Sequence, residues 1–286
     1  MNIEFHCDAK RSLGDEKCAV RAFLYTDYSI PPHNHEFYEM NIVLRGVGTH
    51  EIENSRFRVK AGDVFVIPPM TVHAYCDTRE LDVYHILIRK NFITGNMTEA
   101  ASIPGFLQLV EIEPFLRRHF SDAMFLHLGA GELVKLRGEL AFIEDGGEFD
   151  REELYPLKHH SLWKILYSLS YMLYRQLHSS KKDTKNKYEH SVLTALEYIH
   201  QNYFEKITIE DLCAITYLSR STLLRSFGEI CGCSPTVYLG RYRCERAAEL
   251  MNSAAMSKTE IANACGFYDL SHMERMLKNQ IPFSLQ

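Results

Sequence analysis

Short apolar-rich runs alternate with turn residues in the first third of the chain, and this pattern predicts strands. The expected strands are Tyr38–Leu44, Thr49–Glu53, Arg56–Lys60, Val64–Ile67 and Val83–Ile88. A glycine turn is expected between the first two, at residues 45–48. Short strands at regular spacing are typical of a sandwich or a barrel, which we expect over residues 20–90.

After residue 96 the apolar residues take helical spacing. Residues 105–119 and 131–143 predict short helices, and residues 161–177 predict a longer one. The longer segment carries an apolar stripe near heptad spacing, made of Leu162, Ile165, Leu166, Leu169, Met172, Leu173 and Leu177. Such a stripe must be buried, either against the chain's own barrel or between two subunits. We expect the second, and therefore a homodimer.

The last eighty residues contain one short two-helix unit twice. Leu218–Phe227 aligns on Tyr268–Leu277, fifty residues later. Ser219 then falls on Asp269, and both are favoured N-cap residues. In each copy a shorter helix comes first, so the predicted pairs span residues 208–231 and 257–281.

Each second helix is predicted to have an apolar face and a polar one. At about 100° per residue, Leu223 and Phe227 share one side, while Ser221 and Arg225 lie on the other. A short helix, a tight turn and a capped helix with arginine outward form a helix-turn-helix, whose second helix enters the major groove of DNA. The connecting helix, residues 236–251, would be about 24 Å long. Such a connector suits two successive grooves, roughly 34 Å apart.

Residues 190–286 resemble the DNA-binding domain of the AraC/XylS family of bacterial transcription regulators. The resemblance is carried by Ile207–Leu212, Tyr217–Ser219, Arg225-x-Phe227, Gly232-x-Ser234-Pro235, Arg243…Ala247 and Ile261-Ala262…Gly266-Phe267-x-Asp269-x-Ser271. It implies double-stranded DNA as partner. The residues expected to contact DNA are Arg220, Ser221, Thr222, Arg225, Leu270, Ser271, Glu274 and Arg275. Two departures stand out: Gly228-Glu229 where members usually carry two lysines, and Gly240 inside the connecting helix.

A second constellation lies among the predicted strands. The spacings His33-x-His35-x3-Glu39-x6-Gly46 and Gly62-x5-Pro68…His73 resemble the two cupin motifs. The resemblance implies a jelly-roll barrel, which AraC-type regulators often carry as a sensor. His33, His35, Glu39 and His73 are expected to point into one interior. They would contact a small effector such as a sugar, hold a first-row transition metal, or form a structural polar cluster. We expect effector contact and assign no cofactor.

Composition and charge add limits to this interpretation. The 286 residues are 46% hydrophobic and 24% charged, as in ordinary globular proteins. No signal peptide or membrane span is evident, so we expect a cytoplasmic protein. The eight cysteines show no disulfide framework. Residues 188–286 hold nine Lys and Arg against eleven Asp and Glu, which predicts modest DNA affinity per chain.

The sequence thus predicts an α+β multidomain protein. Residues 1–95 form a cupin-like sensor, 96–180 a helical dimerisation region, 181–189 a polar linker and 190–286 an all-α DNA-binding domain with two helix-turn-helix units. The predicted function is a ligand-responsive transcription regulator. The sequence does not separate an activator, which would contact RNA polymerase, from a repressor. The alternative is a metal-dependent cupin enzyme acting on a small substrate, which would have no use for the duplicated unit.

Overall fold

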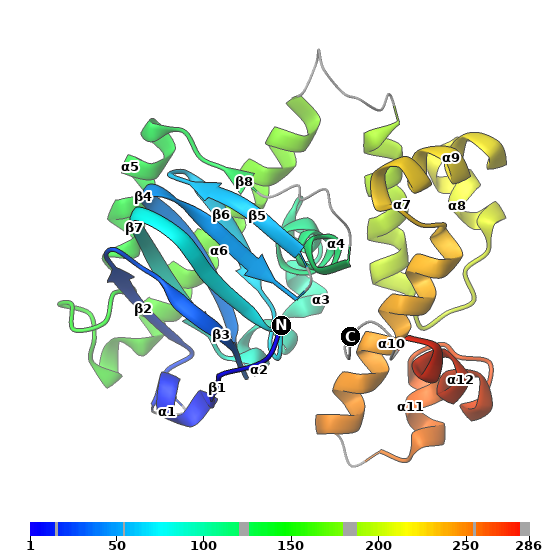
Figure 1. Ribbon diagram of the computed structural model, residues 1–286, viewed down its shortest axis with the longest axis horizontal. Helices are drawn as coiled ribbons and strands as arrows, with labels where there is room; N and C mark the ends of the chain where they lie inside the picture. The colour runs from blue at the N-terminus through cyan, green and yellow to red at the C-terminus, as the bar shows by residue number, and fades with distance from the viewer. Residues whose placement is uncertain (15–16, 54, 120–125, 180–187, 254–255, 281–286) are drawn as a thin grey trace. The chain divides into compact units, whose positions relative to one another are not determined.

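The computed structural model describes residues 1–286 except 15–16, 54, 120–125, 180–187, 254–255 and 281–286 (Figure 1). The chain divides into two compact units, Met1–Ser180 and Lys181–Gln286. Strands and helices build the first, and the described part of the second is helical, so the α+β prediction is confirmed. Most of the predicted linker, residues 181–187, lies outside the described residues. No described helix is long and apolar enough to cross a bilayer.

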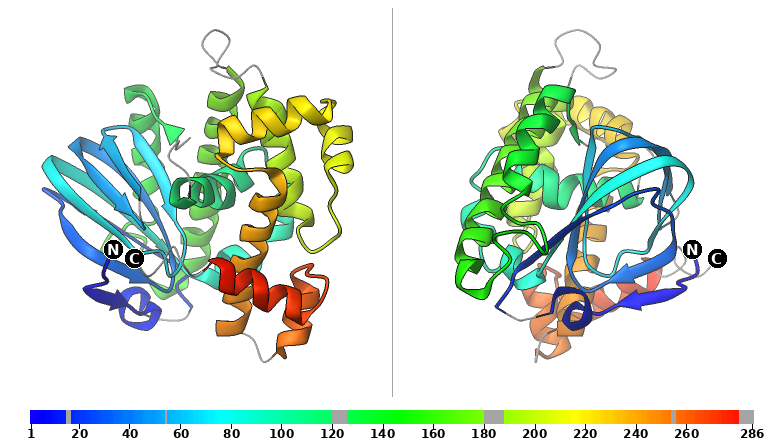
Figure 2. Two further views of the ribbon diagram at one scale, coloured as in Figure 1. Left: turned by 45° about the vertical axis from the view of Figure 1, so that its right-hand side comes forward. Right: turned by 90° about the vertical axis from the view of Figure 1, so that its left-hand side faces the viewer.

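Two long strands, β4 (Tyr38–Ile52) and β7 (His73–Ile88), run antiparallel along each other and organise the first unit. Shorter strands complete the sheet, and four of them pair directly with β4 or β7 in the described part of the chain. The shorter strands are β1 (Phe5–Cys7), β2 (Val20–Tyr25), β3 (Ile30–His35), β5 (Ser55–Lys60), β6 (Asp63–Ile67) and β8 (Leu126–His127). At one end β3 flanks β7 and β5 flanks β4, whereas at the other end β2 flanks β7 and β6 flanks β4. The eight-stranded sheet therefore bends where the partners change (Figure 2).

The predicted glycine turn at residues 45–48 is wrong, because β4 continues through it. The register with β7 shifts three times between Val43 and Thr49, which marks bulges rather than a chain reversal. Gly46 has φ +79°, and a Cβ built there would lie 2.2 Å from the Glu80 carbonyl oxygen. Glycine is thus required at this bend by the close approach of β7.

Helices cover one face of this sheet (Figure 2). They are α2 (Lys90–Thr94), α3 (Met97–Ala100), the π-helix η1 (Gln108–Ile112), α5 (Ala130–Leu140) and α6 (Tyr155–Ser179). The helix α4 (Glu113–His119) packs on β6 instead, where Arg117 lies over the Phe65 ring. The helix α1 (Ala9–Leu13) and the 3₁₀ turn η2 (Glu152–Leu154) are not part of this layer. The stripe of α6 packs into the sheet's own core with Met40, Ile42 and Ile86. Leu162, Ile165, Leu166, Leu169 and Leu173 are at most 1% exposed. Our expectation that this stripe joins two subunits is therefore wrong, since it is covered within one chain.

The second unit consists of α7 (Glu189–Asn202), α8 (Ile209–Thr216), α9 (Arg220–Cys231), α10 (Pro235–Ser253), α11 (Lys258–Ala264) and α12 (Leu270–Gln280). Thr208 and Ser257 begin α8 and α11 with matching capping boxes. Ser219 caps α9, and Asp269 accepts a hydrogen bond from the His272 amide at the start of α12. The duplication seen in the sequence is thus repeated in the helix ends.

Gly240 has a packing reason within α10. A Cβ built there would lie 2.7 Å from Cε of Met276 on α12. Glycine in a helix interior costs about 1 kcal/mol relative to alanine. Here its absence of a side chain lets α12 approach α10.

Candidate functional site: a buried histidine and carboxylate cluster, and two exposed helices

The two faces of the sheet differ in chemistry. On β4, Met40 and Ile42 point to the helix-covered core, while Glu39 and Asn41 point to the opposite, inner face. On β7, Tyr84 and Ile86 join the core, and His85 lies on the inner face. Glu39, Asn41 and His85 are each less than 5% exposed, so buried polar groups line the inside of the bent sheet.

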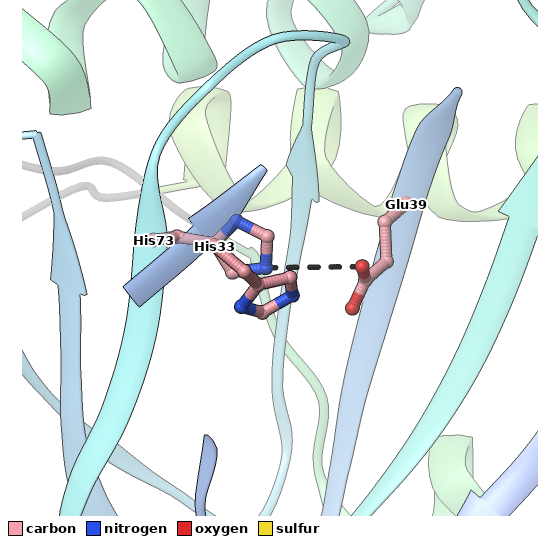
Figure 3. Close-up of side chains that lie close together, drawn as sticks. All are labelled: His33, Glu39 and His73. Carbon is pink, nitrogen blue, oxygen red and sulfur yellow. Dashed lines mark ion pairs between the residues drawn. The ribbon is translucent and has the colours of Figure 1, made fainter. Parts of the chain in front are cut away.

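Three of the four predicted effector residues come from neighbouring strands. His33 and His35 lie on β3, and His73 begins β7 directly opposite His33. Glu39 was expected to follow the two histidines on one strand, but β3 ends at His35 and β4 begins at Tyr38. The break does not turn Glu39 away: Figure 3 shows it facing His73 and His33. All four side chains are buried, with at most 4% exposed.

Glu39 is the centre of the cluster. Its Oε2 lies 3.2 Å from Nε2 of His35 and 3.8 Å from Nε2 of His73. Its Oε1 accepts a hydrogen bond from Nδ1 of His85 at 2.7 Å. One carboxylate therefore contacts three imidazoles that come from two different strands.

The backbone fixes the tautomers of the three predicted histidines. Nδ1 of His33 donates to the Pro31 carbonyl at 3.0 Å, that of His35 to Phe37 at 2.7 Å and that of His73 to Thr71 at 3.2 Å. A carbonyl oxygen only accepts, so each Nδ1 carries hydrogen. In the neutral rings the lone pair is then at Nε2, the atom that faces Glu39 in His35 and His73.

Burial sets the charge states. It lowers the pKa of His73 well below the usual 6.5 and also lowers the pKa of His33, while the nearby Glu39 carboxylate opposes both shifts. Burial alone would raise the pKa of Glu39, but its contacts with His35 and His85 hold it well below 4.5. Near neutral pH the cluster is thus a carboxylate beside neutral imidazole rings at His33 and His73.

His85 is a site residue that the sequence interpretation missed. Neither motif contains it, and it stands in an apolar run, Val83–Ile88, that is read simply as a buried strand. A signal was present: Val83, His85 and Leu87 alternate with Tyr84, Ile86 and Ile88. Alternation places His85 on the face opposite the core, where Glu39 also points.

A cavity of about 460 Å³ lies beside the cluster, within the first unit. His33, His35, Glu39 and His85 line it, whereas His73 does not belong to its lining. Most of its other walls are aromatic or apolar: Phe23, Leu24, Tyr25, Tyr28, Ile30, Phe37 and Leu87. Cys7, Ser12 and the ion pair of Arg21 with Asp145 also line it. A volume of this size accommodates a small organic molecule.

The cluster also fits a metal ion chemically. Ligand atoms of His33, Glu39 and His73 all lie within 4.8 Å of one another. Imidazole nitrogen and carboxylate oxygen suit first-row divalent cations. A ligating histidine commonly donates its other N–H to a backbone carbonyl, as His33 and His73 do. His33, Glu39 and His73 would hold such an ion, which would supply positive charge at the cavity wall.

On the second unit, the expected DNA contacts lie at exposed or half-buried positions of α9 and α12. Arg220, Ser221, Arg225, Ser271, Glu274 and Arg275 are exposed, while Thr222 and Leu270 are half-buried. Thr222 takes part in the N-cap of α9, with its hydroxyl 2.9 Å from that of Ser219. Leu270 packs beside the core of the second helix pair. Leu223, Phe227 and Met273 are fully buried, which orients both helices as the pattern predicts.

Several charged residues on these helices have partners of opposite sign. Nη1 of Arg220 donates to Glu210, and Nε of Arg225 lies 3.9 Å from Oε1 of Glu229. On α12, Glu274 lies 3.6 Å from Nζ of Lys258. These pairs are exposed, so each contributes little to stability and can exchange for a phosphate contact.

Comparison with known proteins gives the same two parts. A model described as the AraC-like ligand binding domain matches residues 20–136, and a helix-turn-helix domain model matches residues 212–281. The HTH-type transcriptional activator RhaS of Klebsiella pneumoniae is 25% identical over 259 residues, 90% of this chain and 86% of that protein. RhaS of Yersinia pseudotuberculosis is 25% identical over 254 residues, 88% of this chain and 86% of that protein.

These relatives are transcription regulators, so the alternative of a metal-dependent enzyme is set aside. A sensor sheet with a lined cavity and two capped helix-turn-helix pairs agree with both matched models. The chain belongs to the AraC/XylS family and is a ligand-responsive DNA-binding transcription regulator with an AraC-like ligand-binding domain ahead of its helix-turn-helix domain.

Proposed function

We propose that a small effector binds in the inner-face cavity and changes how α9 and α12 engage DNA. The observation that carries this proposal is the cavity of about 460 Å³ in the unit that matches a ligand-binding model. Its wall includes Glu39 and His85, two buried groups able to accept or donate hydrogen bonds. The effector shifts the regulator only by binding one arrangement of the protein more tightly than another.

The lining favours a sugar-sized polar molecule with an apolar face. Tyr25 and Tyr28 stack at 5.3 Å, and Phe23 packs edge-on to Tyr25 at 5.1 Å, so aromatic rings make up one wall of the cavity. Glu39, His33 and His35 supply polar groups to the same cavity. A carbohydrate combines hydroxyls for the polar groups with C–H faces for the rings.

DNA would be read by the exposed sides of α9 and α12. Arg225 and Arg275 occupy equivalent positions on the two helices, and arginine pairs bidentately with guanine in the major groove. Arg220, Ser221 and Thr222 surround the first, and Leu270, Ser271 and Glu274 the second. The DNA-binding surface is thus richer in donors around Arg225.

The remaining features follow from this assignment. The RhaS relatives are activators, and we infer the same mode here, with RNA polymerase as partner. We also infer a homodimer, which must use surface other than the buried leucine stripe of α6. The protein would act in the cytoplasm, where bacterial DNA lies.

Selection of genomic DNA fragments on the purified full-length protein tests the proposal. We expect a small set of fragments that share one sequence pattern, and genes beside them that narrow the effector class. Candidate compounds, beginning with monosaccharides, are then added to the binding reaction. A shift in affinity for the selected fragment is expected with one of them, and a Tyr28→Ala variant should lose that shift while keeping basal DNA binding. Fragments without a shared pattern would contradict the assignment.

A further inference from the structure

We propose that His85 is a positioning residue for a divalent first-row transition cation bound by His33, Glu39 and His73. This inference deepens the proposed function, because the ion would form part of the wall that an effector meets. The cavity and the cluster share Glu39 and His33, so a ligand there and an ion would lie against the same side chains.

The two oxygens of the Glu39 carboxylate have different partners. Its Oε1 takes the hydrogen bond from Nδ1 of His85 at 2.7 Å. Its Oε2 faces Nε2 of His35 and of His73 at 3.2 and 3.8 Å. With Oε1 occupied, Oε2 is held toward the histidines, so His85 decides which oxygen is offered to an ion.

His85 is itself held rigidly. Its ring centroid lies 4.6 Å from Tyr28, 5.3 Å from Tyr25 and 5.8 Å from Phe23. Because Glu39 is an acceptor, Nδ1 carries hydrogen and the ring cannot turn without losing this bond. A buried ring caged by three aromatic side chains is a firm support for a carboxylate.

Every ion-pair partner of Glu39 found among the described residues is a histidine. Nε2 of His73 is completely buried and has no hydrogen-bond partner in the part of the chain that the structure describes, and it faces Oε2 of Glu39 at 3.8 Å. Electron pairs of His73 and Glu39 that face each other repel, unless a cation lies between them. His33 adds a third donor within 4.8 Å, and its Nδ1–H is tied to Pro31. Three ligand atoms that converge with fixed orientations are what a divalent ion requires.

A proton is the competing cation. An imidazolium at His35 would place an N–H between its Nε2 and Oε2 of Glu39, and it would satisfy that pair without metal. It would leave Nε2 of His73 without a hydrogen-bond partner among the described residues. The two cases differ in whether the purified protein takes up a metal ion.

The test is a titration of full-length protein, freed of metal with a chelator, with Co²⁺ alone. Visible absorption reports ligand geometry, and competition with a chelator of known affinity gives the Kd. We expect one Co²⁺ per chain. His85→Leu should weaken binding 10- to 100-fold and alter the spectrum, as is typical when a group that orients a metal ligand is lost. His85→Asn, whose amide N–H can replace Nδ1–H, should remain within about threefold of the wild type.

Two further variants keep the result decisive. His85→Gln serves if the leucine variant does not fold, because its amide lies at the Nε2 position and leaves Oε1 of Glu39 without its donor. His50→Asn is the matched control: His50 is a buried histidine 5.8 Å from His73 by ring centroids, and no hydrogen bond or ion pair between it and Glu39 is found in the described part of the chain. It should leave the Kd within about threefold of the wild type.

Absence of stoichiometric Co²⁺ uptake by the wild type would overturn the proposal in favour of the proton. Equal affinity in wild type, His85→Leu and His85→Gln would overturn the role of His85, and so would failure of His85→Asn to restore binding. Neither result would touch the proposed function, because sequence-specific DNA binding by the metal-free protein is measured separately on the same preparations.

Discussion

Nδ1 of His85 donates to Oε1 of Glu39 at 2.7 Å, although the two residues lie 46 positions apart in the chain. The bond spans β4 and β7, whose long antiparallel pairing brings Asn41 opposite His85 and Glu39 opposite Leu87. A bent two-strand frame thus places a carboxylate of one motif beside a histidine that belongs to neither motif.

The burial of the α6 stripe makes a prediction about oligomer state. Leu166→Glu together with Leu173→Glu should unfold or aggregate the protein rather than give a folded monomer, because both side chains are at most 1% exposed within their own unit. A buried unpaired charge costs several kcal/mol. Sedimentation and circular dichroism measure the outcome. Tyr171→Glu, at a 52% exposed position of the same helix, should stay folded. A well-folded monomeric double variant would restore the stripe as an interface.

Gly266 gives a stability prediction for the second unit. It has φ +72°, and a Cβ there would lie 2.6 Å from the Tyr203 carbonyl oxygen. Gly266→Ala should therefore lower the free energy of unfolding by roughly 1–3 kcal/mol. The matched control is Gly228→Ala in α9, where a Cβ meets no atom within 4 Å, so up to about 1 kcal/mol of stabilisation is expected. Urea unfolding compares the two; equal effects would show that the turn tolerates a side chain.

His200 predicts a pH dependence. It is 5% exposed, its Nε2 lies 2.8 Å from the Tyr238 hydroxyl, and burial lowers its pKa from 6.5 to about 3. Below pH 6.5 the His200 side chain binds a proton in the unfolded chain but not in the folded chain. Stability is thus complete above pH 6.5 and falls by about 1.4 kcal/mol per pH unit from 6.5 toward 3. Urea unfolding at pH 7.5 and 5.5 measures this loss, and His200→Gln should reduce the difference by about that amount. An unchanged difference would exclude His200 as its source.

Glu229 predicts a gain in DNA affinity. It stands two positions after Phe227, where the family that the sequence resembles usually carries lysine. Its Oε1 lies 3.9 Å from Nε of Arg225. Glu229→Gln should strengthen binding at fixed salt, because it removes a negative charge near the phosphates and frees the arginine. Fluorescence anisotropy at several salt concentrations measures the effect. Glu189→Gln on α7 is the comparison for a charge change outside the two reading helices, and equal gains from both would indicate only a net-charge effect.

How far the sequence predicted the structure depended on the range of the interactions. The helix-turn-helix pairs were predictable because caps such as Ser219 and buried residues such as Phe227 act within one or two turns. The bend of β4 was not, since glycines at residues 46 and 48 signal a turn unless the close approach of Glu80 is known. His85 was missed for a similar reason: its function depends on a partner on another strand. The leucine stripe showed burial but not which surface buries it.

The central claim is that the chain reads DNA through α9 and α12. The most direct measurement is competition binding of wild type, Arg225→Ala and Arg275→Ala to one selected genomic fragment at fixed salt. We predict that Arg225→Ala weakens specific binding by at least ~1 kcal/mol and relaxes preference at one base pair, while Arg275→Ala, beside the acidic Glu274, has a smaller effect. Equal losses would contradict the asymmetry. Unchanged specific binding in both variants would contradict the claim that these helices read the sequence.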